Sequence, residues 1–472
     1  MASIGILSVS DGRPGVHAGI ARFVADSEDT IVGALEAAGH TVTRGSRAIC
    51  TNAQAVSEAR RLAAASPDLT IVNIPVWAFP HFTVLVASET PGHLLLLSTL
   101  DPAYPGMVGM LAAGGALDQV GRRHARAWGD ARDPAVTAAV GRHAAAAGAL
   151  RTLRGSTFGR IGGRPMGMYT AVANPDQWMA MFGIDVEEID QWELVRRAER
   201  VDDGRARAGR EWLEHHAAGV HYDGDRLTPE LLERQIRCYH ALRELVDDWH
   251  LDFLGVKAQP ELTDNFCTMD VAEAFLNDPY DWEGPKDPIV CSTEADMDGA
   301  LTMQILRSLS GTPVLFADVR HYHEDLDVWD LCNSGEHATW FAARSDEAVE
   351  NLARVHLYPE EFYFPAGGAA VHHLAAPGTF TFARLTRRGG RYRLQTMLGE
   401  LVQFEDDENE RLMRASTYVW PHAFAKLAAG PDEILGRYGA NHIHAVPGDY
   451  AAELRTVCDL AGIEFDPLGD TA

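Results

Sequence analysis

Two acidic residues, Glu294 and Asp318, occupy comparable positions within one segment of the chain. The run 288–293 is apolar and has the length of a strand, and Glu294 follows it directly. The run 313–317 is similar and ends at Asp318. Between the two runs, apolar residues recur at helical spacing. The segment therefore predicts a strand–helix–strand unit with one carboxylate at the end of each strand.

This arrangement would bring the two carboxylates together. The strands of a strand–helix–strand unit are parallel, so their carboxyl ends meet at the sheet edge where open α/β sheets bind ligands. Paired carboxylates repel each other, and a divalent cation commonly relieves the repulsion. The plainer alternative is that each residue caps the following helix or is solvated in a loop. Short patterns do not distinguish these alternatives by themselves.

Composition excludes several classes of function. The chain has 67 acidic and 41 basic residues and a net charge of −26, which disfavours nucleic acids and anionic membranes as partners. The N-terminus has no basic segment or long apolar core of a signal peptide, and we expect a cytoplasmic protein. The six cysteines form no CxxC pair, which indicates reduced thiols.

The order of predicted elements indicates an α/β fold of three domains. Strands and helices alternate in the first part, which predicts a parallel sheet covered on both faces. We expect two Rossmann-like parallel-sheet domains followed by a β-rich, barrel-like C-terminal domain. The predicted ranges are 1–160, a central 161–350 that carries Glu294 and Asp318, and 351–472 that carries His442. Within them, 165–173 is expected to be a strand and 422–428 a helix.

Several short and uncommon sequence motifs follow one another along the chain in a particular order. The central ones are EAFLNDPYDWEG, STEADMDGALTM and FADVRHY, and CNSGE, FPAGGAAVHH and GANHIHAVPGDY follow them. In these words the chain resembles the L-fucose isomerases. DGRPGV and NIPVW near the N-terminus are two weaker landmarks of the same resemblance. The intervening sequence diverges, and the chain is shorter than the long bacterial enzymes.

The resemblance implies a metal centre. It carries the family's metal-binding glutamate and aspartate onto Glu294 and Asp318, which would also serve as acid and base. The third ligand falls on His442, and His444, two residues on and on the same strand face, is the alternative. Oxygen ligands with one imidazole suit Mn²⁺, with Co²⁺ and Mg²⁺ as alternatives.

The resemblance also implies residues that contact the sugar. Their plainer interpretations are a surface arginine, a packed tryptophan and solvated loop side chains. In the resembling enzymes the aromatic residue at position 77 closes the pocket of a neighbouring subunit, which implies a homo-oligomer, a hexamer or a trimer. The candidates are Arg13, Trp77, Gln259, Asn333 and Ser334.

The expected reaction interconverts an aldose and its ketose through a metal-stabilised enediolate, of the L-fucose/L-fuculose or D-arabinose/D-ribulose type. One alternative keeps the mechanism and changes the sugar to a galactose-like or sulfonated hexose. Arg320, His321 and His323 follow Asp318 closely and could bind an anionic group. A second alternative is a non-catalytic sugar-binding protein, which would need no metal and would normally carry an export signal.

Overall fold

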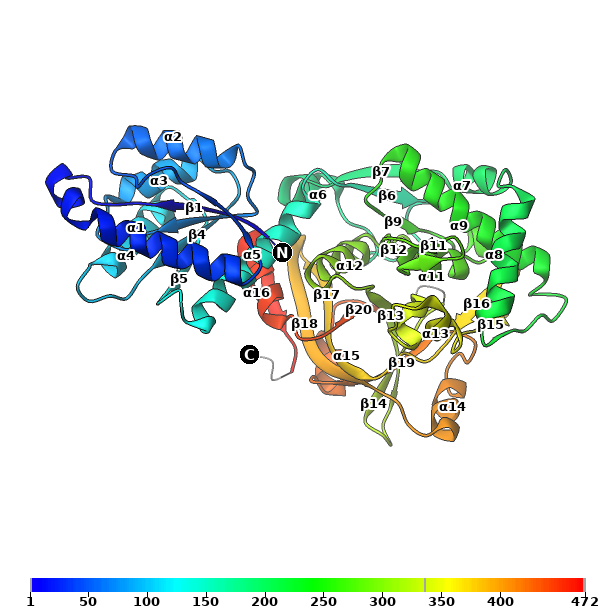
Figure 1. The fold of residues 1–472 in the computed structure, drawn as a ribbon. Helices are drawn as coiled ribbons and strands as arrows, with labels where there is room; N and C mark the ends of the chain where they lie inside the picture. Colours follow the sequence, from blue (N-terminus) through cyan, green and yellow to red (C-terminus); the bar gives the residue numbers. More distant parts are fainter. Residues whose placement is uncertain (1, 335–336, 470–472) are drawn as a thin grey trace. The chain divides into compact units, whose positions relative to one another are not determined.

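The chain forms two compact units (Figure 1). The computed structural model describes residues 2–334 and 337–469. The first unit comprises Met1–Thr152 and Ala452–Gly462, and the second comprises Leu153–Ala451 and Ile463–Ala472. Each unit is described by itself below. The predicted division into domains 1–160, 161–350 and 351–472 stays a prediction.

The first unit is a five-stranded parallel sheet with helices on both faces. Its strands lie in the order β2-β1-β3-β4-β5, so β3 is central. The strands are β1 (Ser3–Ser8), β2 (Thr41–Arg44), β3 (Leu69–Asn73), β4 (His93–Ser98) and β5 (Ala125–Trp128). The helices are α1 (Pro14–Ala37), α2 (Asn52–Ala63), α3 (Pro80–Glu89), α4 (Gly106–Gln119), α5 (Pro134–Leu153) and α16 (Ala451–Ala461).

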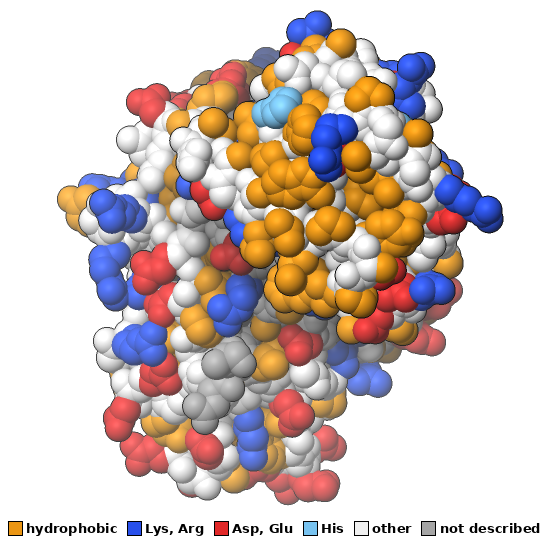
Figure 2. Space-filling view, turned by 90° about the vertical axis from the view of Figure 1, so that its left-hand side faces the viewer, with side chains coloured by type: hydrophobic (Ala, Val, Ile, Leu, Met, Phe, Trp, Pro, Cys, Tyr) orange, Lys and Arg blue, Asp and Glu red, His pale blue; other side chains and the backbone are white. Residues whose placement is uncertain are grey.

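One helix of this unit leaves apolar side chains uncovered. Helix α4 buries Met110 and Leu117 but exposes Met107, Val108 and Leu111, each about half exposed. Figure 2 shows a broad cluster of hydrophobic side chains on one face of the molecule. An apolar surface of this kind marks a contact site more often than a free surface.

The second unit begins with a four-stranded parallel sheet in the order β12-β9-β6-β7. Its strands are β6 (Thr157–Ile161), β7 (Asp185–Ile189), β9 (Phe253–Val256) and β12 (Cys291–Thr293). Its helices are α6 (Pro175–Phe182), α7 (Gln191–Ala198), α8 (Asp203–His216), α9 (Pro229–Trp249), α10 (Glu261–Asn265), α11 (Asp270–Asn277) and α12 (Met297–Ser310). Small sheets are formed by β8 (Gly219–Val220), β15 (His356–Pro359) and β16 (Ala369–His372), and by β10 (Tyr280–Asp281) and β11 (Gly284–Pro285).

The rest of this unit is a closed β-structure. Its strands follow the order β17-β20-β13-β14-β19-β18-β21, and an additional β17–β18 pairing closes a ring. The interior packs Phe380, Phe382, Leu331 and Ile443. The strands are β13 (Leu315–His323), β14 (Val328–Cys332), β17 (Gly378–Arg388), β18 (Arg391–Val402), β19 (His422–Leu427), β20 (His442–Pro447) and β21 (Glu464–Pro467). The short helices are η1 (Thr339–Ala342), α13 (Ala348–Leu352), α14 (Asp406–Arg414) and α15 (Pro431–Arg437).

The expected fold class is therefore confirmed: two parallel sheets precede a barrel-like, mainly antiparallel one. Helix α12 lies between the parallel sheet and the barrel, and it packs against β9 and β12 on one side and β17 and β20 on the other. It begins at Asp296, whose side chain accepts a hydrogen bond from the Gly299 N–H, and ends at Gly311 in the left-handed conformation. All residues from 297 to 306 are buried, as expected for a helix with neighbours on every side.

Three local predictions were wrong. Strand β13 pairs antiparallel with β14 and β20 rather than parallel with β12, so the strand–helix–strand unit does not form and Asp318 lies inside a strand. The apolar start of β13 is too short to distinguish a parallel from an antiparallel strand. Residues 165–173 form turns in which Met166 and Gly167 have positive φ. The segment 422–427 is strand β19, because pairing with β14 and β18 overrides its helical propensity.

No helix in the described part of the chain is long and apolar enough to cross a membrane.

Candidate functional site

Glu294 is held in a strained turn between β12 and α12. Its φ is +55° and that of Ala295 is +47°, which is the left-handed region that non-glycine residues rarely adopt. The Ala295 N–H donates to the carbonyl of Val256 at 2.9 Å, which ties the turn to the neighbouring strand. Backbone strain of this kind occurs preferentially at functional sites. The Glu294 side chain is thereby directed from the parallel sheet toward the barrel.

A glycine allows this turn to approach the sheet. A Cβ atom at Gly255 of β9 would lie 2.5 Å from Ser292 Oγ and 2.9 Å from the Cα atom of Ala295. Neither contact is tolerated between ordinary side-chain and backbone atoms. Gly255 is therefore needed for the position of the Glu294–Ala295 turn.

Asp318 and His442 come from adjacent barrel strands. They are directly opposite each other in the antiparallel register of β13 and β20. Side chains of opposed residues lie on the same face of a sheet and close together. The pairing thus brings a carboxylate and an imidazole to one point, although they are far apart in the sequence.

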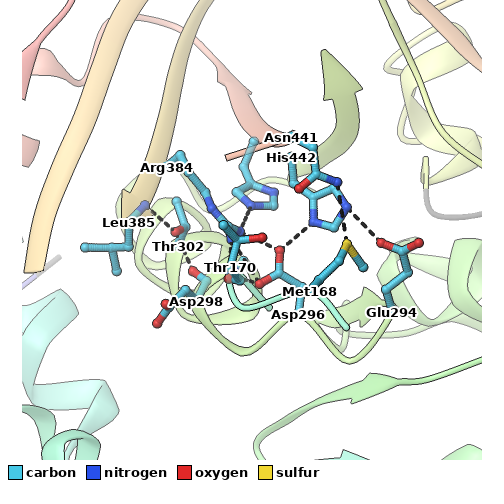
Figure 3. A network of polar contacts seen from close by, with 12 residues as sticks. Met168, Thr170, Glu294, Asp296, Asp298, Thr302, Arg384, Leu385, Asn441 and His442 are labelled. Carbon is cyan, nitrogen blue, oxygen red and sulfur yellow. Dashed lines mark hydrogen bonds and ion pairs between the residues drawn. The ribbon is translucent and has the colours of Figure 1, made fainter. Parts of the chain in front are cut away.

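The His442 ring faces the Glu294 carboxylate (Figure 3), and Asp318 lies near the same ring nitrogen. The Nε2 atom of His442 lies 2.9 Å from Glu294 Oε2 and 3.6 Å from Asp318 Oδ1. His442 is fully buried, Glu294 is 7% exposed, and Asp318 is partly exposed. The cluster is therefore open to a small ligand on the Asp318 side.

The other ring nitrogen of His442 is held by Asp296, whose Oδ2 lies 2.6 Å from Nδ1. This contact fixes the orientation of the ring, with Nε2 facing Glu294 and Asp318. Burial alone would lower the pKa of His442, but the hydrogen bonds to Asp296 and Glu294 raise it to about 10. Burial would raise the pKa of Asp296, but Arg384 and His442 hold it below its usual range. The carboxylates thus stabilise a positive charge at His442.

Arg384 completes this arrangement from β17. Its Nη1 and Nη2 atoms donate to the two oxygens of Asp296 at 2.6 and 3.1 Å. Nη1 also lies 3.1 Å from His444 Nε2. Burial, and the charge of Arg384 beside it, hold the pKa of His444 well below the usual value. His444 is therefore a neutral neighbour of Arg384, whereas His442 faces the two carboxylates.

Two amides orient Asp318. Asn333 Nδ2 donates to one carboxylate oxygen at 2.9 Å, and Asn441 Nδ2 donates to the other at 3.1 Å. Asn333 and its neighbour Ser334, directly after β14, are both buried. Met168, from the loop after β6, contacts Asn441 through its sulfur at 3.8 Å. Asp318 is thus fixed in place by hydrogen bonds that leave its charge intact.

The cluster fits a divalent cation in its chemistry. Glu294 Oε2 and His442 Nε2 are buried and contact each other at 2.9 Å, and neither has a further hydrogen-bond partner among the described residues. Buried polar atoms normally have partners, so such atoms indicate a ligand. The donors are two carboxylates and one imidazole, a set suited to Mn²⁺, and a carboxylate behind the histidine is typical of metal sites. As the side chains lie here, in direct ion-pair contact, no three His, Cys, Asp or Glu in the described ranges are arranged to hold a metal.

Comparison with known proteins gives the family. Three family models match the chain: "L-fucose isomerase, first N-terminal domain" over residues 1–155, "second N-terminal domain" over 250–311, and "C-terminal domain" over 331–468. The chain belongs to the L-fucose isomerase family. It is also 24% identical to the L-fucose isomerases of Escherichia coli strains SE11 and K12/DH10B, over 489 aligned positions that cover 87% of this chain and 82% of each relative. Membership of this family implies an aldose–ketose isomerase.

Five of the residues predicted for the L-fucose isomerase site lie near one another in the second unit: Glu294, Asp318, His442, Asn333 and Ser334. Gln259 is half-buried in the loop after β9, on the same parallel sheet as Glu294. Their roles as ligands and sugar contacts stay predictions.

Arg13 and Trp77 belong to the first unit. Arg13 is exposed before α1, and its guanidinium pairs with Asp11 at 2.6 Å. That hydrogen bond holds the pKa of Asp11 below its usual value. Trp77 is half-buried in the loop after β3. Their contact with a sugar also stays a prediction.

The sequence analysis missed Asp296 and Arg384. Asp296 stands at the start of a helix, where acidic residues are common as caps, so nothing in the sequence indicated a further role. Arg384 could have been identified from the sequence, because strand alternation places it on the same face as Phe380 and Phe382, which are buried. An arginine on an apolar face requires a buried partner, which is Asp296 here.

Proposed function

We propose that this protein is a Mn²⁺-dependent intramolecular oxidoreductase that interconverts an aldose and its ketose, of the L-fucose/L-fuculose or D-arabinose/D-ribulose type. Glu294, Asp318 and His442 hold the ion. The observation that supports this is the convergence of Glu294 Oε2 and Asp318 Oδ1 on His442 Nε2 in a largely buried site. Co²⁺ or Mg²⁺ could replace Mn²⁺ with this ligand set.

The reaction moves a proton between C1 and C2 of the sugar while the carbonyl moves in the opposite direction. A divalent cation supplies Lewis-acid stabilisation of the charge that develops when the proton leaves carbon. The protein must supply a group that takes the proton and returns it to the neighbouring carbon. Burial of the site excludes water, which would otherwise exchange with that proton.

The two carboxylates have different surroundings, and this supports different roles for them. Glu294 Oε2 contacts His442 Nε2 and has no further hydrogen-bond partner among the described residues, which supports a role in accepting a proton from carbon. Both oxygens of Asp318 accept hydrogen bonds from amides, which hold the carboxylate in one orientation. We assign the proton transfer at carbon to Glu294 and proton transfer at the sugar oxygens to Asp318.

The remaining predicted residues would bind the sugar. Asn333, Ser334 and Gln259 offer neutral hydrogen-bonding groups, which suit hydroxyls. Arg13 and Trp77 of the first unit would add an ionic donor and a stacking surface. A galactose-like or sulfonated hexose remains the alternative substrate, and Arg320, which donates to Thr417 Oγ1 at 3.0 Å and stacks over Trp420, is the cation for a sulfonate.

The apolar surface of α4 supports a homo-oligomer, a hexamer or a trimer. Met107, Val108 and Leu111 lie on this surface. The N-terminal end of α4 packs against the 74–76 backbone, directly before Trp77: a Cβ at Gly106 would lie 2.7 Å from the Pro75 carbonyl oxygen. A second copy seated on α4 would therefore lie beside the helix that packs against the Trp77 loop. In this assembly Trp77 would close the neighbouring copy's pocket.

Turnover over a panel of aldoses tests the proposal. We expect interconversion of at least one aldose with Mn²⁺, and its loss after treatment with EDTA. Glu294→Gln should lower kcat by about 10³-fold or more, because it removes the proposed base. Glu400→Gln, an exposed strand residue with the same change, should keep wild-type turnover.

Metal binding is measured separately by isothermal titration calorimetry with Mn²⁺. Asp318→Asn should weaken it while the protein remains folded by circular dichroism. The proposal is wrong if no aldose is converted by the Mn²⁺-treated protein, or if EDTA leaves the conversion unchanged.

A further inference from the structure

A cavity of about 420 Å³ lies in the second unit, apart from the site described above. It is lined by the loop after β6, the start of α12 and strand β17, but not by Glu294, Asp318 or His442. In Figure 3, Asp298 and Leu385, which line it, lie on the opposite side of Arg384 from Glu294. Small-molecule sites typically have volumes of about 300–1,000 Å³. The cavity is thus large enough for a ligand of its own.

The charge of this cavity is opposite to that of the protein. Arg164, Arg384 and Arg387 line it, and Asp298 is the one acidic residue among its lining side chains. The chain as a whole carries a net charge of −26. Arg384 pairs with Asp296 and Arg387 pairs with Asp298, so Arg164 leaves a net positive charge in this hollow, which attracts anions. A neutral sugar would not require this arrangement.

One of these charges is uncompensated. The Arg164 guanidinium lies over the ring of Tyr169 at 4.9 Å, and it forms no ion pair with the carboxylates that the structure describes. Both side chains are exposed at the rim of the cavity. Stacking holds the guanidinium in place and leaves its N–H groups free to bind an anion.

The other two arginines are fixed by the loop that carries Arg164. Arg384 Nη2 donates to the Thr170 carbonyl at 2.9 Å. Arg387 Nη2 donates to the Val172 carbonyl, and Arg387 Nε donates to Asp298 at 2.9 Å. The Arg384 Nε–H is buried and has no acceptor in the described part of the chain. The guanidinium groups of Arg384 and Arg387 are therefore held in place before any ligand binds, as an anion site requires.

We propose that this cavity binds a phosphate-class oxyanion, either free phosphate or the phosphate group of a small ester. Arginine forks match the oxygens of such a group better than any other side chain. The cavity is larger than phosphate alone, and the space beside Thr170, Asn174 and Thr386 offers hydrogen bonds to a polar remainder. The site goes beyond the isomerase function and does not depend on it.

Isothermal titration of the full chain tests this proposal with inorganic phosphate and with fructose 1-phosphate, against unphosphorylated fructose. We expect saturable binding of at least one phosphate probe. Arg164→Gln and Arg387→Gln should each weaken it about tenfold. Arg388→Gln is the matched control, because this exposed neighbour on β17 does not line the cavity, and it should change affinity less than about twofold.

The outcomes separate the alternatives. Tighter binding of the ester than of phosphate identifies a phosphorylated metabolite as the ligand, and equal binding identifies the free anion. The proposal is overturned if neither probe binds saturably, if fructose binds as well as its phosphate, or if Arg388→Gln weakens binding as much as Arg164→Gln. Arg387→Gln removes a largely buried ion pair, so exposed Arg164→Gln decides the outcome if the former does not fold.

Discussion

Asp296 Oδ2 lies 2.6 Å from His442 Nδ1, and both side chains are completely buried. The two residues are 146 positions apart in the sequence. One stands at the start of a helix that follows the parallel sheet, and the other begins a barrel strand. This contact orients the imidazole so that its other nitrogen faces Glu294 and Asp318.

Asp296→Asn should therefore weaken Mn²⁺ binding by about 10–100-fold, the usual effect of removing a carboxylate behind a ligating histidine. The change keeps the shape of the side chain but removes its charge. Isothermal titration with Mn²⁺ measures the effect. Asp298→Asn is the control, because Asp298 is equally buried and pairs with Arg387 and Tyr392 instead. Equal losses of Mn²⁺ affinity in both variants would show that any change of charge at the start of α12 weakens binding, whether or not it touches His442.

Substitution of the two barrel histidines should distinguish them. His442→Gln should weaken Mn²⁺ binding about 100-fold or more, because it removes a proposed metal ligand. His444→Gln should leave it within a few-fold of wild type, because a glutamine oxygen can still accept from Arg384 at this position. Electron paramagnetic resonance of bound Mn²⁺ provides a readout independent of turnover. The opposite order of effects would assign the ligand to His444.

Gly255→Ala should destabilise the protein by about 1–3 kcal/mol, because the added methyl group overlaps Ser292 and Ala295. Chemical denaturation measures the loss. Gly33→Ala in α1 is the control: a Cβ there meets nothing within 4 Å, and alanine should stabilise the helix by about 0.5–1 kcal/mol. An unchanged free energy of unfolding for Gly255→Ala would mean that the turn relaxes freely.

His240 should make stability depend on pH. Burial lowers its pKa to about 4, and its Nε2 accepts a hydrogen bond from Trp282 Nε1 at 3.1 Å. In the unfolded chain the ring takes up a proton below about pH 6.5, whereas in the folded protein it does so only near pH 4. Stability contributed by the neutral ring is therefore lost as the pH falls through this window.

His240→Gln should lose less stability than the wild type between these pH values, because glutamine can accept the same hydrogen bond and does not titrate there. Urea denaturation at pH 7, 5.5 and about 4 measures the difference. Parallel curves for the two proteins would exclude His240 as a contributor.

The α4 surface should control assembly. Val108→Asp combined with Leu111→Asp should lower the mass measured by analytical ultracentrifugation, because a charge in an apolar interface is not compensated. Leu435→Asp in α15 is the control, since Leu435 is 77% exposed. A wild-type monomer, or a double variant with unchanged mass, would place any assembly contact elsewhere.

The sequence determined the composition of the site and most of the elements around it. Alternating apolar and amphipathic segments predicted the parallel sheets, and the glycine pair at 389–390 predicted the β17–β18 hairpin. Uncommon sequence words singled out Glu294, Asp318 and His442. These signals are local, because periodicity, turn residues and motif spacing are properties of a short stretch of chain.

The tertiary structure decided which of these residues meet and what supports them. Asp318 lies in an antiparallel strand, opposite His442, because strand pairing depends on partners distant in the sequence. Asp296 has a sufficient local explanation as a helix cap, and its contacts with His442 and Arg384 exist only once α12 packs between the sheet and the barrel. Buried polar partners are chosen by packing, which no local pattern encodes.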